Sequence, residues 1–339
     1  MSLYVNFDKL FSFNALINVV LGDRGCGKSF NSKVAVMKNY LKTGEQFLYL
    51  RRYKTELDSA LATFFDDLQA NGYFKDHELK VKKSRMLTTF LCDGEVCGYA
   101  VPLSTSNILK STAFPLVKTI IFDEFILDVD AGSYRYLKNE CQLLLDTIET
   151  VFRLREGRVL MLGNVINFYG CPHVAYFQLD LPFNSEYRTF KDGAIVVYYI
   201  KNPEYQKVKS QTRFGKLIEG TVYGDYCIGN KSLRENTAFI GKRPSNCKFY
   251  AHLVLNGSDY GVWSGIDGYL YISEKFDPSA GLTYACDFDD HTEQTIFLNI
   301  RENYILKYCL KAYKQGWLKF ENLRIKSDLT NLFNKCLSI

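Results

Sequence analysis

The sequence predicts an α/β protein of two domains, and three observations carry this prediction. Near the N-terminus, a short apolar run is followed by a glycine-rich loop and then by a helical pattern. Further along, a second apolar run ends in two adjacent carboxylates. In the last third of the chain, an antiparallel meander precedes another helical pattern. A chain of 339 residues is long enough to form two separate cores.

Composition excludes several classes of protein. Hydrophobic residues make up 47% of the chain and aromatic residues 15%, which is typical of folded domains. The formal net charge of +5 is too small to indicate nucleic-acid binding by itself. No apolar run approaches the ~20 residues that cross a membrane, and no secretory leader is present, so we expect an intracellular protein without a membrane partner. The ten cysteines show no zinc-binding spacing and are expected to be buried thiols.

The glycine-rich loop has the form G-x-x-x-x-G-K-S. An expected strand over 16–21 precedes it and an expected helix over 29–41 follows it, which is the context of a phosphate-binding P-loop. Glycines let backbone N–H groups turn toward phosphates, and the helix N-terminus adds a positive dipole end. We predict that Lys28 reaches the β- and γ-phosphates and that Ser29 ligates Mg²⁺. The nucleotide-binding residues expected here are Gly22, Asp23, Arg24, Gly25, Cys26, Gly27, Lys28 and Ser29.

The second apolar strand, over 117–122, ends in Asp123 and Glu124, which is the Walker B pattern. Asp123 is expected to hold the Mg²⁺ shell, and Glu124 to polarise the attacking water as a general base. A glutamate after the aspartate indicates the ASCE branch of P-loop ATPases, which has an extra strand between the P-loop strand and the Walker B strand. The strand expected over 159–164 ends in Asn164, which either senses the γ-phosphate or simply ends the strand in a turn.

Other elements of the first domain, expected over 1–200, follow from hydrophobic periodicity. Helices are predicted over 54–70 and 136–152, and a meander of short strands over 79–100. The last strands of the first sheet are predicted over 174–179 and 194–200.

Two basic regions are candidates for nucleic-acid contact. One follows the strand expected over 46–50, where a surface cluster facing solvent is the alternative. The other is a basic linker expected over 201–245. Residues 201–250 hold ten Lys and Arg against four Asp and Glu, a net charge of +6. Such a segment can follow a phosphate backbone without reading bases, although a solvated face is again the alternative. The candidate residues are Arg51, Arg52, Lys54, Lys207, Lys209, Arg213 and Lys216.

The C-terminal domain, expected over 246–339, begins with a meander whose first turn is Asn256-Gly257. Antiparallel strands followed by helices indicate a smaller RNase H-like α/β domain. A metal-dependent nuclease on that fold needs carboxylates that begin on the first strand. The first strand carries Ala251 and His252 instead, and the later Asp287, Asp289 and Asp290 fit a solvated turn. The sequence therefore predicts a vestigial nuclease domain without nuclease activity.

Several stretches together resemble a known family, the DNA encapsidation proteins of small podophages whose DNA replication is primed by a terminal protein. The likeness rests on the P-loop, on Ile121-Phe122-Asp123-Glu124-Phe125-Ile126 and on Thr212-Arg213-Phe214-Gly215, and it extends over most of the chain. These proteins are genome-packaging motor ATPases. The resemblance implies ATP and Mg²⁺ as cofactors and a homo-oligomeric ring, usually a pentamer. The ring would act in the host cytoplasm at the portal of a preformed capsid, and it would move double-stranded DNA inward, in some cases with a packaging RNA.

The resemblance also implies roles for single residues. Arg153 matches an arginine that acts in trans on the nucleotide of the neighbouring subunit, although Arg155 and Arg158 lie close enough to take its place. Lys110 matches a lysine of the subunit interface. Asn164 matches the residue that holds the catalytic glutamate inactive until DNA is gripped.

Two other functions compete with DNA packaging. The first is a helicase-like or other nucleic-acid-remodelling ASCE ATPase, although no helicase motif follows the Walker B strand. The second is a nucleotide-gated adaptor without turnover. Glu124 argues against the adaptor, because nucleotide binding alone needs no general base.

Overall fold

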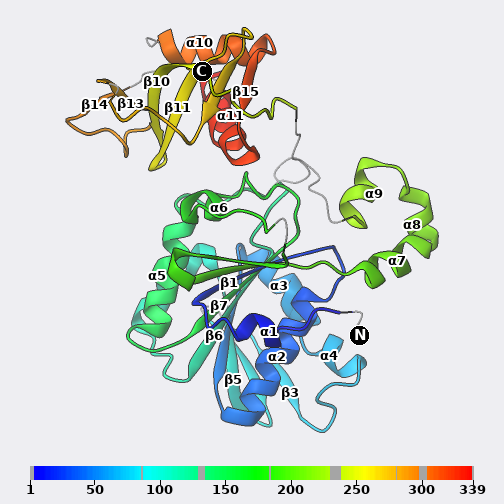
Figure 1. The fold of residues 1–339 in the computed structure, drawn as a ribbon. Coiled ribbons are helices and arrows are strands. Elements are labelled where there is room, and N and C mark those ends of the chain that lie inside the picture. The colour runs from blue at the N-terminus through cyan, green and yellow to red at the C-terminus, as the bar shows by residue number, and fades with distance from the viewer. Residues whose placement is uncertain are drawn as a thin grey trace. The chain divides into compact units, whose positions relative to one another are not determined.

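The computed structural model describes residues 4–84, 87–128, 134–182, 185–229, 238–279, 281–297 and 304–337. The chain divides into two compact units (Figure 1). The first contains Met1–Phe168 and Leu179–Arg234, and the second contains Tyr169–Gln178 and Glu235–Ile339. Within the described part of the chain, every helix is too short or too polar to cross a bilayer.

Over its described residues, the first unit is built on one sheet of nine strands. The P-loop strand β1 is separated from the Walker B strand β6 by β7, so the extra strand expected of an ASCE ATPase is present. The six strands from β5 to β9 in the sheet order run parallel, while the edge pairs β3–β4, β4–β5 and β8–β9 are antiparallel. The sheet order is β3 (Leu79–Lys82), β4 (Thr88–Cys92), β5 (Glu95–Pro102), β2 (Gln46–Arg51), β6 (Val117–Asp123), β7 (Arg158–Gly163), β1 (Ile17–Leu21), β9 (Ile195–Tyr199) and β8 (Tyr187–Phe190).

Helices cover both faces of this sheet (Figure 1). The connection from β1 through α2 (Lys28–Thr43) to β2 crosses the sheet in one direction, and that from β6 through α5 (Glu140–Phe152) to β7 crosses it in the other. Because such crossovers are right-handed, α2 and α5 lie on opposite faces. Other helical elements described before β7 are α1 (Asp8–Phe11), α3 (Lys54–Ala62), α4 (Asp66–Ala70) and the 3-10 helix η1 (Leu103–Ser111). A short 3-10 turn, η2 (Lys191–Gly193), precedes β9.

Several predicted elements differ from the structure. The strand predicted over 174–179 is wrong: Pro172–Phe177 forms the helix α6, with Pro172 in its first turn. A short apolar run does not distinguish a buried strand from a buried helix by periodicity, and the proline at the helix start was the signal that mattered. The helix predicted over 54–70 is divided into α3 and α4, and that predicted over 136–152 begins only at Glu140.

The segment expected as a basic linker is helical over much of its described length. The helices α7 (Pro203–Gln211), α8 (Arg213–Ile218) and α9 (Val222–Cys227) follow β9 and belong to the first unit. Each is preceded by a residue whose side chain accepts a hydrogen bond from the backbone N–H three residues later: Asn202, Thr212 and Thr221. These three caps explain why a polar, charged segment forms defined helices.

In the part of it that the structure describes, the second unit contains a six-stranded mixed sheet and the helices α6, α10 (Tyr304–Lys314) and α11 (Leu323–Leu337). The sheet order is β14 (Thr295–Phe297), β13 (Thr283–Ala285), β10 (Lys248–Leu255), β11 (Ser258–Ser264), β12 (Leu270–Ser273) and β15 (Leu318–Phe320). Strands β10 to β12 form the predicted antiparallel meander, and β13 and β14 continue the sheet in parallel with β10. The helices α10 and α11 complete the core, as expected of an RNase H-like arrangement.

A buried ion pair joins the end of β2 to α5 within the first unit. The Arg52 guanidinium donates to Glu140 at 2.7 Å from Nε and at 2.8 Å from Nη2, and both side chains are 0% exposed. Arg52 also donates to the backbone oxygens of Glu124 and Phe125, at 3.2 Å and 2.6 Å. The prediction that Arg52 contacts nucleic acid is therefore wrong, because its charge is neutralised inside the fold.

Removing one partner of this pair is expected to destabilise the first unit strongly. Arg52→Met leaves Glu140 as a buried charge without its partner, which costs about 3–5 kcal/mol. The double variant Arg52→Met/Glu140→Leu removes both charges and is expected to recover most of that stability. Urea unfolding of the full chain measures both effects, with Lys42→Met as a surface control. A single variant as stable as the control would contradict this account.

Candidate nucleotide-binding site

The P-loop adopts a conformation that requires glycine at two positions. Gly25 and Gly27 both have φ of 89°, in the left-handed region that other residues rarely adopt. Gly27 is also the N-cap of α2, so the loop runs directly into the helix N-terminus. Backbone N–H groups and the positive end of the helix dipole therefore converge at the loop, which favours binding of an anion.

Lys28 is buried inside this loop. Its Nζ donates to the backbone oxygens of Gly22 and Asp23 and to Oδ1 of Asn164, each at 2.9 Å. Cys26 Sγ lies 3.6 Å from the same Nζ, and burial raises the pKa of this thiol. The structure thus brings Asn164, from the end of β7, to the P-loop lysine, whereas the family resemblance implied a contact with Glu124.

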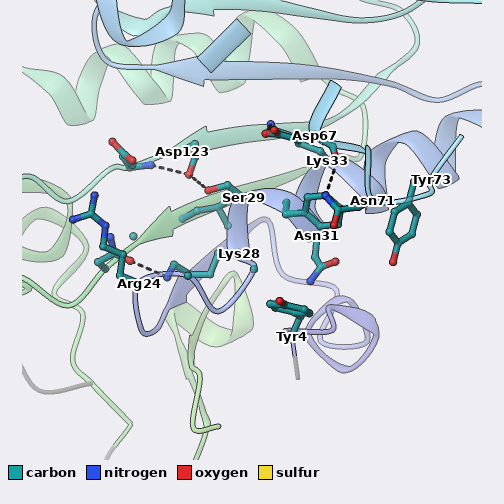
Figure 2. Close-up of a pocket in the computed structure, with 17 residues that line it drawn as sticks. Tyr4, Arg24, Lys28, Ser29, Asn31, Lys33, Asp67, Asn71, Tyr73 and Asp123 are labelled. Atoms are coloured by element: carbon teal, nitrogen blue, oxygen red, sulfur yellow. Dashed lines mark hydrogen bonds and ion pairs between the residues drawn. The ribbon is translucent and has the colours of Figure 1, made fainter. Parts of the chain in front are cut away.

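Ser29 and Asp123 meet at the ends of neighbouring structural elements. The Ser29 hydroxyl donates to Asp123 Oδ1 at 2.8 Å (Figure 2). On the other side, the Tyr49 hydroxyl donates to Asp123 Oδ2 at 2.9 Å. Burial and the neighbouring Asp123 raise the pKa of Tyr49 well above its usual value, so its hydroxyl stays protonated. The Ser29 hydroxyl and the Asp123 carboxylate are hard oxygen donors, and their chemistry fits Mg²⁺.

Glu124 has a partner that the sequence did not suggest. Arg51 Nη2 lies 2.6 Å from Glu124 Oε2, and Arg51 Nη1 lies 3.3 Å from Asp123 Oδ2. Glu124 has a φ of 56°, a strained conformation for a residue with a side chain, which turns the chain sharply at the end of β6. The Glu124 side chain is 57% exposed. The prediction that Arg51 contacts nucleic acid therefore does not fit, because its guanidinium faces the Walker B carboxylates.

These residues line one pocket of about 710 Å³. Lys28, Ser29, Asp123, Glu124 and Asn164 form its polar end. Aromatic side chains also line the pocket: Tyr4 lies beside the P-loop, where a Cβ atom on Gly27 would be 3.1 Å from its ring, and Figure 2 shows Tyr73 beyond Asn31. The pocket is thus large enough for a nucleotide and combines a polar P-loop with aromatic rings.

Lys110 and Arg153 lie together at a different place. Both line a hollow of about 460 Å³ with Glu149, Thr150 and Leu154, and neither lines the P-loop pocket. Arg153 caps the C-terminus of α5 with φ 51° and ψ −116°, an unusual backbone conformation. Leu154 beside it is fully exposed.

The two other arginines near Arg153 have intramolecular partners. Arg155 donates to the backbone oxygens of Pro115 and Val151. The Arg158 guanidinium lies over the ring of Phe11, 4.5 Å from its centroid. Their positions favour Arg153 as the arginine that faces outward.

The remaining basic candidates divide into two groups. Lys54 is exposed and lies 3.6 Å from Asp58 on the same helix, and Lys207, Arg213 and Lys216 are exposed on α7 and α8. Lys209 instead donates to the backbone oxygens of Arg24 and Cys227, each at 2.6 Å. Among the candidates, Lys209 is therefore a contact of the P-loop itself.

Sequence reasoning also missed a small polar cluster on the edge of the first sheet. His77 Nδ1 lies 2.6 Å from Asp93 Oδ2, and ligand atoms of His77, Cys92 and Asp93 all lie within 4.8 Å of one another. Asp93 Oδ1 accepts the Glu78 N–H at 2.7 Å, so this carboxylate also closes the turn. The residues are adjacent only because β3 and β4 pair, and their spacing along the chain carried no signal.

With this geometry established, comparison with known proteins identifies the family. The model of the podovirus DNA encapsidation protein (Gp16) family matches residues 1–337. The chain belongs to this family. It is 37% identical over 337 residues to the DNA packaging protein of Bacillus phage phi29, which covers 98% of each chain. It is 36% identical over 329 residues to the DNA packaging protein of Bacillus phage B103, covering 96% of this chain and 99% of that protein.

Solved structures agree with this assignment. A chain of the bacteriophage phi29 genome packaging motor assembly superposes with a TM-score of 0.76 at 36% identity, covering 98% of this chain and 99% of that one. The crystal structure of the N-terminal domain of the phi29 DNA packaging ATPase gives a TM-score of 0.53 at 37% identity, over 60% of this chain and 100% of that one. As a member of the family, the chain is a DNA packaging protein.

Proposed function

We propose that this chain is the ATP-hydrolysing subunit of a motor that moves double-stranded viral DNA through the portal into a preformed capsid. The observation that carries the proposal is the meeting of Lys28, Ser29, Asp123 and Glu124 in one pocket, in a chain of the DNA encapsidation family. The relatives' names, a DNA packaging ATPase and a genome packaging motor, support it.

The residues present fit a magnesium nucleotide. The P-loop N–H groups and Lys28 would hold the phosphates, and Ser29 with Asp123 would hold the metal ion. When bound, Mg²⁺ neutralises charge on the phosphate oxygens and helps to orient the phosphate chain. Tyr49 and Arg51 hold the Asp123 carboxylate in place.

Glu124 is the general base in this proposal. It lies at the same sheet edge as Lys28, one residue beyond Asp123, with its side chain more than half exposed. Such a carboxylate accepts the proton of an attacking water and orients that water toward the phosphate. Arg51 is bonded to the same carboxylate, so Glu124 must loosen this ion pair to act as the base.

Glu124→Gln is expected to separate nucleotide binding from hydrolysis. The amide keeps the size of the side chain but does not take a proton, so kcat should fall about 10²- to 10⁴-fold while nucleotide affinity changes little. Steady-state ATP hydrolysis and equilibrium binding of a nucleotide analogue measure the two effects. Glu95→Gln, at the exposed start of β5, is the matched control. Undiminished turnover in Glu124→Gln would refute the assignment.

The nucleotide site is completed in this proposal by a neighbouring subunit. Lys110 and Arg153 line a hollow apart from their own chain's P-loop pocket, and Arg155 and Arg158 are held by other contacts. An arginine supplied in trans neutralises charge on the transferring phosphoryl group and couples hydrolysis to ring assembly. We therefore propose a homo-oligomeric ring, a pentamer by analogy with the family, attached to the portal in the host cytoplasm.

Doping wild-type protein with Arg153→Ala tests the shared site. If each site needs the neighbour's arginine, the rate of ATP hydrolysis per subunit should fall more steeply than the wild-type fraction. This rate per subunit should also rise with protein concentration. ATP hydrolysis is measured against the doped fraction, with Lys42→Ala as the control variant. A linear fall in activity at every concentration would show that the site is complete within one chain.

The second unit is proposed to bind rather than to cut. At the centre of β10, His252 bonds Asp259 at 2.7 Å and Thr283 at 3.1 Å and stacks on Phe276. Asp290 accepts the N–H of Gly257 in the adjoining hairpin turn. His252 therefore occupies the place on β10 where a two-metal nuclease needs its first carboxylate. Portal, DNA and a packaging RNA are the partners proposed for the protein as a whole.

The exposed basic residues of α7 and α8, with Lys54, are proposed to bind the DNA backbone. The variant Lys207→Ala/Arg213→Ala/Lys216→Ala is expected to weaken DNA binding equally for all sequences. The slope of log Kobs against log salt should also become shallower by about 0.9 for each phosphate that is no longer neutralised. Binding titrations over a range of salt concentrations measure the slope. An unchanged slope would exclude these three residues, and Lys42→Ala serves as the charge control.

A further inference from the structure

The helix α7 lies against the outer side of the P-loop. Tyr205 donates from its hydroxyl to the backbone oxygen of Arg24 at 3.2 Å, and Lys209 Nζ donates to the same oxygen at 2.6 Å. Gln206 Nε2 donates to Asp23 Oδ2 at 3.1 Å. Tyr205 and Lys209 are four residues apart and so share one face of the helix. The Arg24 carbonyl of the P-loop thus accepts two hydrogen bonds from α7, the helix that follows β9.

This contact is tight and specific. A Cβ atom placed on Gly25 would lie 2.5 Å from the Tyr205 hydroxyl, so the ring closes directly on the loop. Burial, with Cys26 and Asp23 nearby, raises the pKa of Tyr205 to about 12, and its hydroxyl therefore stays a donor at neutral pH. Lys209 also donates to the backbone oxygen of Cys227 at 2.6 Å, which fixes its ammonium between α9 and the P-loop.

Peptide geometry gives this contact a function. The Arg24 carbonyl and the Gly25 N–H belong to one planar trans peptide, in which they point in opposite directions. Arg24 and Gly25 line the nucleotide pocket, whereas Tyr205 and Lys209 do not. Holding the Arg24 oxygen toward α7 therefore turns the Gly25 N–H toward the pocket. Two donors on the oxygen also polarise the peptide, which strengthens its N–H as a donor.

We propose that Tyr205 and Lys209 are positioning residues that preset the P-loop for phosphate by holding the Arg24 carbonyl. The proposal rests on the nucleotide-binding function of the pocket. It gives Lys209 a role that its place in a basic segment did not suggest. Because coupling is reciprocal, a phosphate bound to the Gly25 N–H in turn stabilises the contact between α7 and the P-loop.

Four variants test this proposal in the full-length protein. Tyr205→Phe and Lys209→Met each remove one donor to Arg24, and the double variant removes both. Removal of a hydrogen bond of this kind weakens binding by about two- to tenfold, so each single variant should raise the Kd for ADP within that range and the double variant further. The rate at saturating ATP should stay within about twofold of wild type, because neither residue approaches the reacting atoms. Lys209→Arg keeps a charged donor and should restore most of the affinity.

Matched controls separate this role from general effects on the helix or on charge. Val208→Ala changes an exposed residue of the same helix, and Lys42→Met removes a surface charge at the far end of α2. Both should bind ADP as wild type does. Hydrogen exchange supplies a second measurement: ADP should slow exchange in α7 of wild type and lose this effect in the double variant.

The outcomes distinguish the proposal from the function on which it rests. A Kd for ADP unchanged in the double variant, or raised equally in Val208→Ala, would overturn the positioning role. Failure of the wild-type protein to bind ADP, with Lys28→Ala no different, would instead overturn the nucleotide site itself. A fall in the rate at saturating ATP with an unchanged Kd would also contradict the proposal, since positioning of the phosphate cradle acts on affinity.

Discussion

Two adjacent arginines at the end of β2 hold the site together because neighbouring side chains of a strand point to opposite faces of the sheet. Arg51 faces the Walker B carboxylates, and Arg52 faces Glu140 at the start of α5. Each arginine is largely or fully buried, so each needs a carboxylate partner to offset the loss of hydration. The requirement to neutralise these two charges fixes the end of β6, where Asp123 and Glu124 lie, from both faces.

Through Arg52 and Glu140, the site is also connected to α5, whose far end carries Arg153. Glu140 is the first residue of this helix and Arg153 is its C-cap. A helix of 13 residues spans about 20 Å at 1.5 Å per residue. Arg52 also bonds the backbone of Glu124 and Phe125, so the Walker B turn and the start of α5 move as one body. In the proposed ring, α5 therefore links a subunit's own catalytic turn to the arginine offered to its neighbour.

The parts of the site that sequence predicts are those set by local geometry. The P-loop needs glycine at two left-handed positions and a lysine at the helix start, and these residues are close together in the chain. The Walker B strand is a continuous apolar run that ends in its functional carboxylates. Parallel strands bring both motifs to one sheet edge, so their meeting follows once the strands are recognised. Lys28, Ser29, Asp123 and Glu124 could be named for this reason.

The parts that sequence does not predict depend on pairing between distant segments. Arg51 and Arg52 resemble one surface cluster, and only the order of β2, β6 and α5 shows that one charge is buried and the other neutralised by the Walker B pair. His77 and Asp93 meet through the pairing of β3 with β4.

Lys209 is a contact on a helix that the sequence likewise did not predict. It counted toward a net positive charge, but a count of charges does not show which side of a helix each charge occupies. The N-cap of α7, Asn202, is visible in the sequence, and a spacing of four residues places Tyr205 and Lys209 on one face of that helix. Their common target, the Arg24 carbonyl, depends on how that helix returns to the loop. That return is decided by tertiary packing rather than by local sequence.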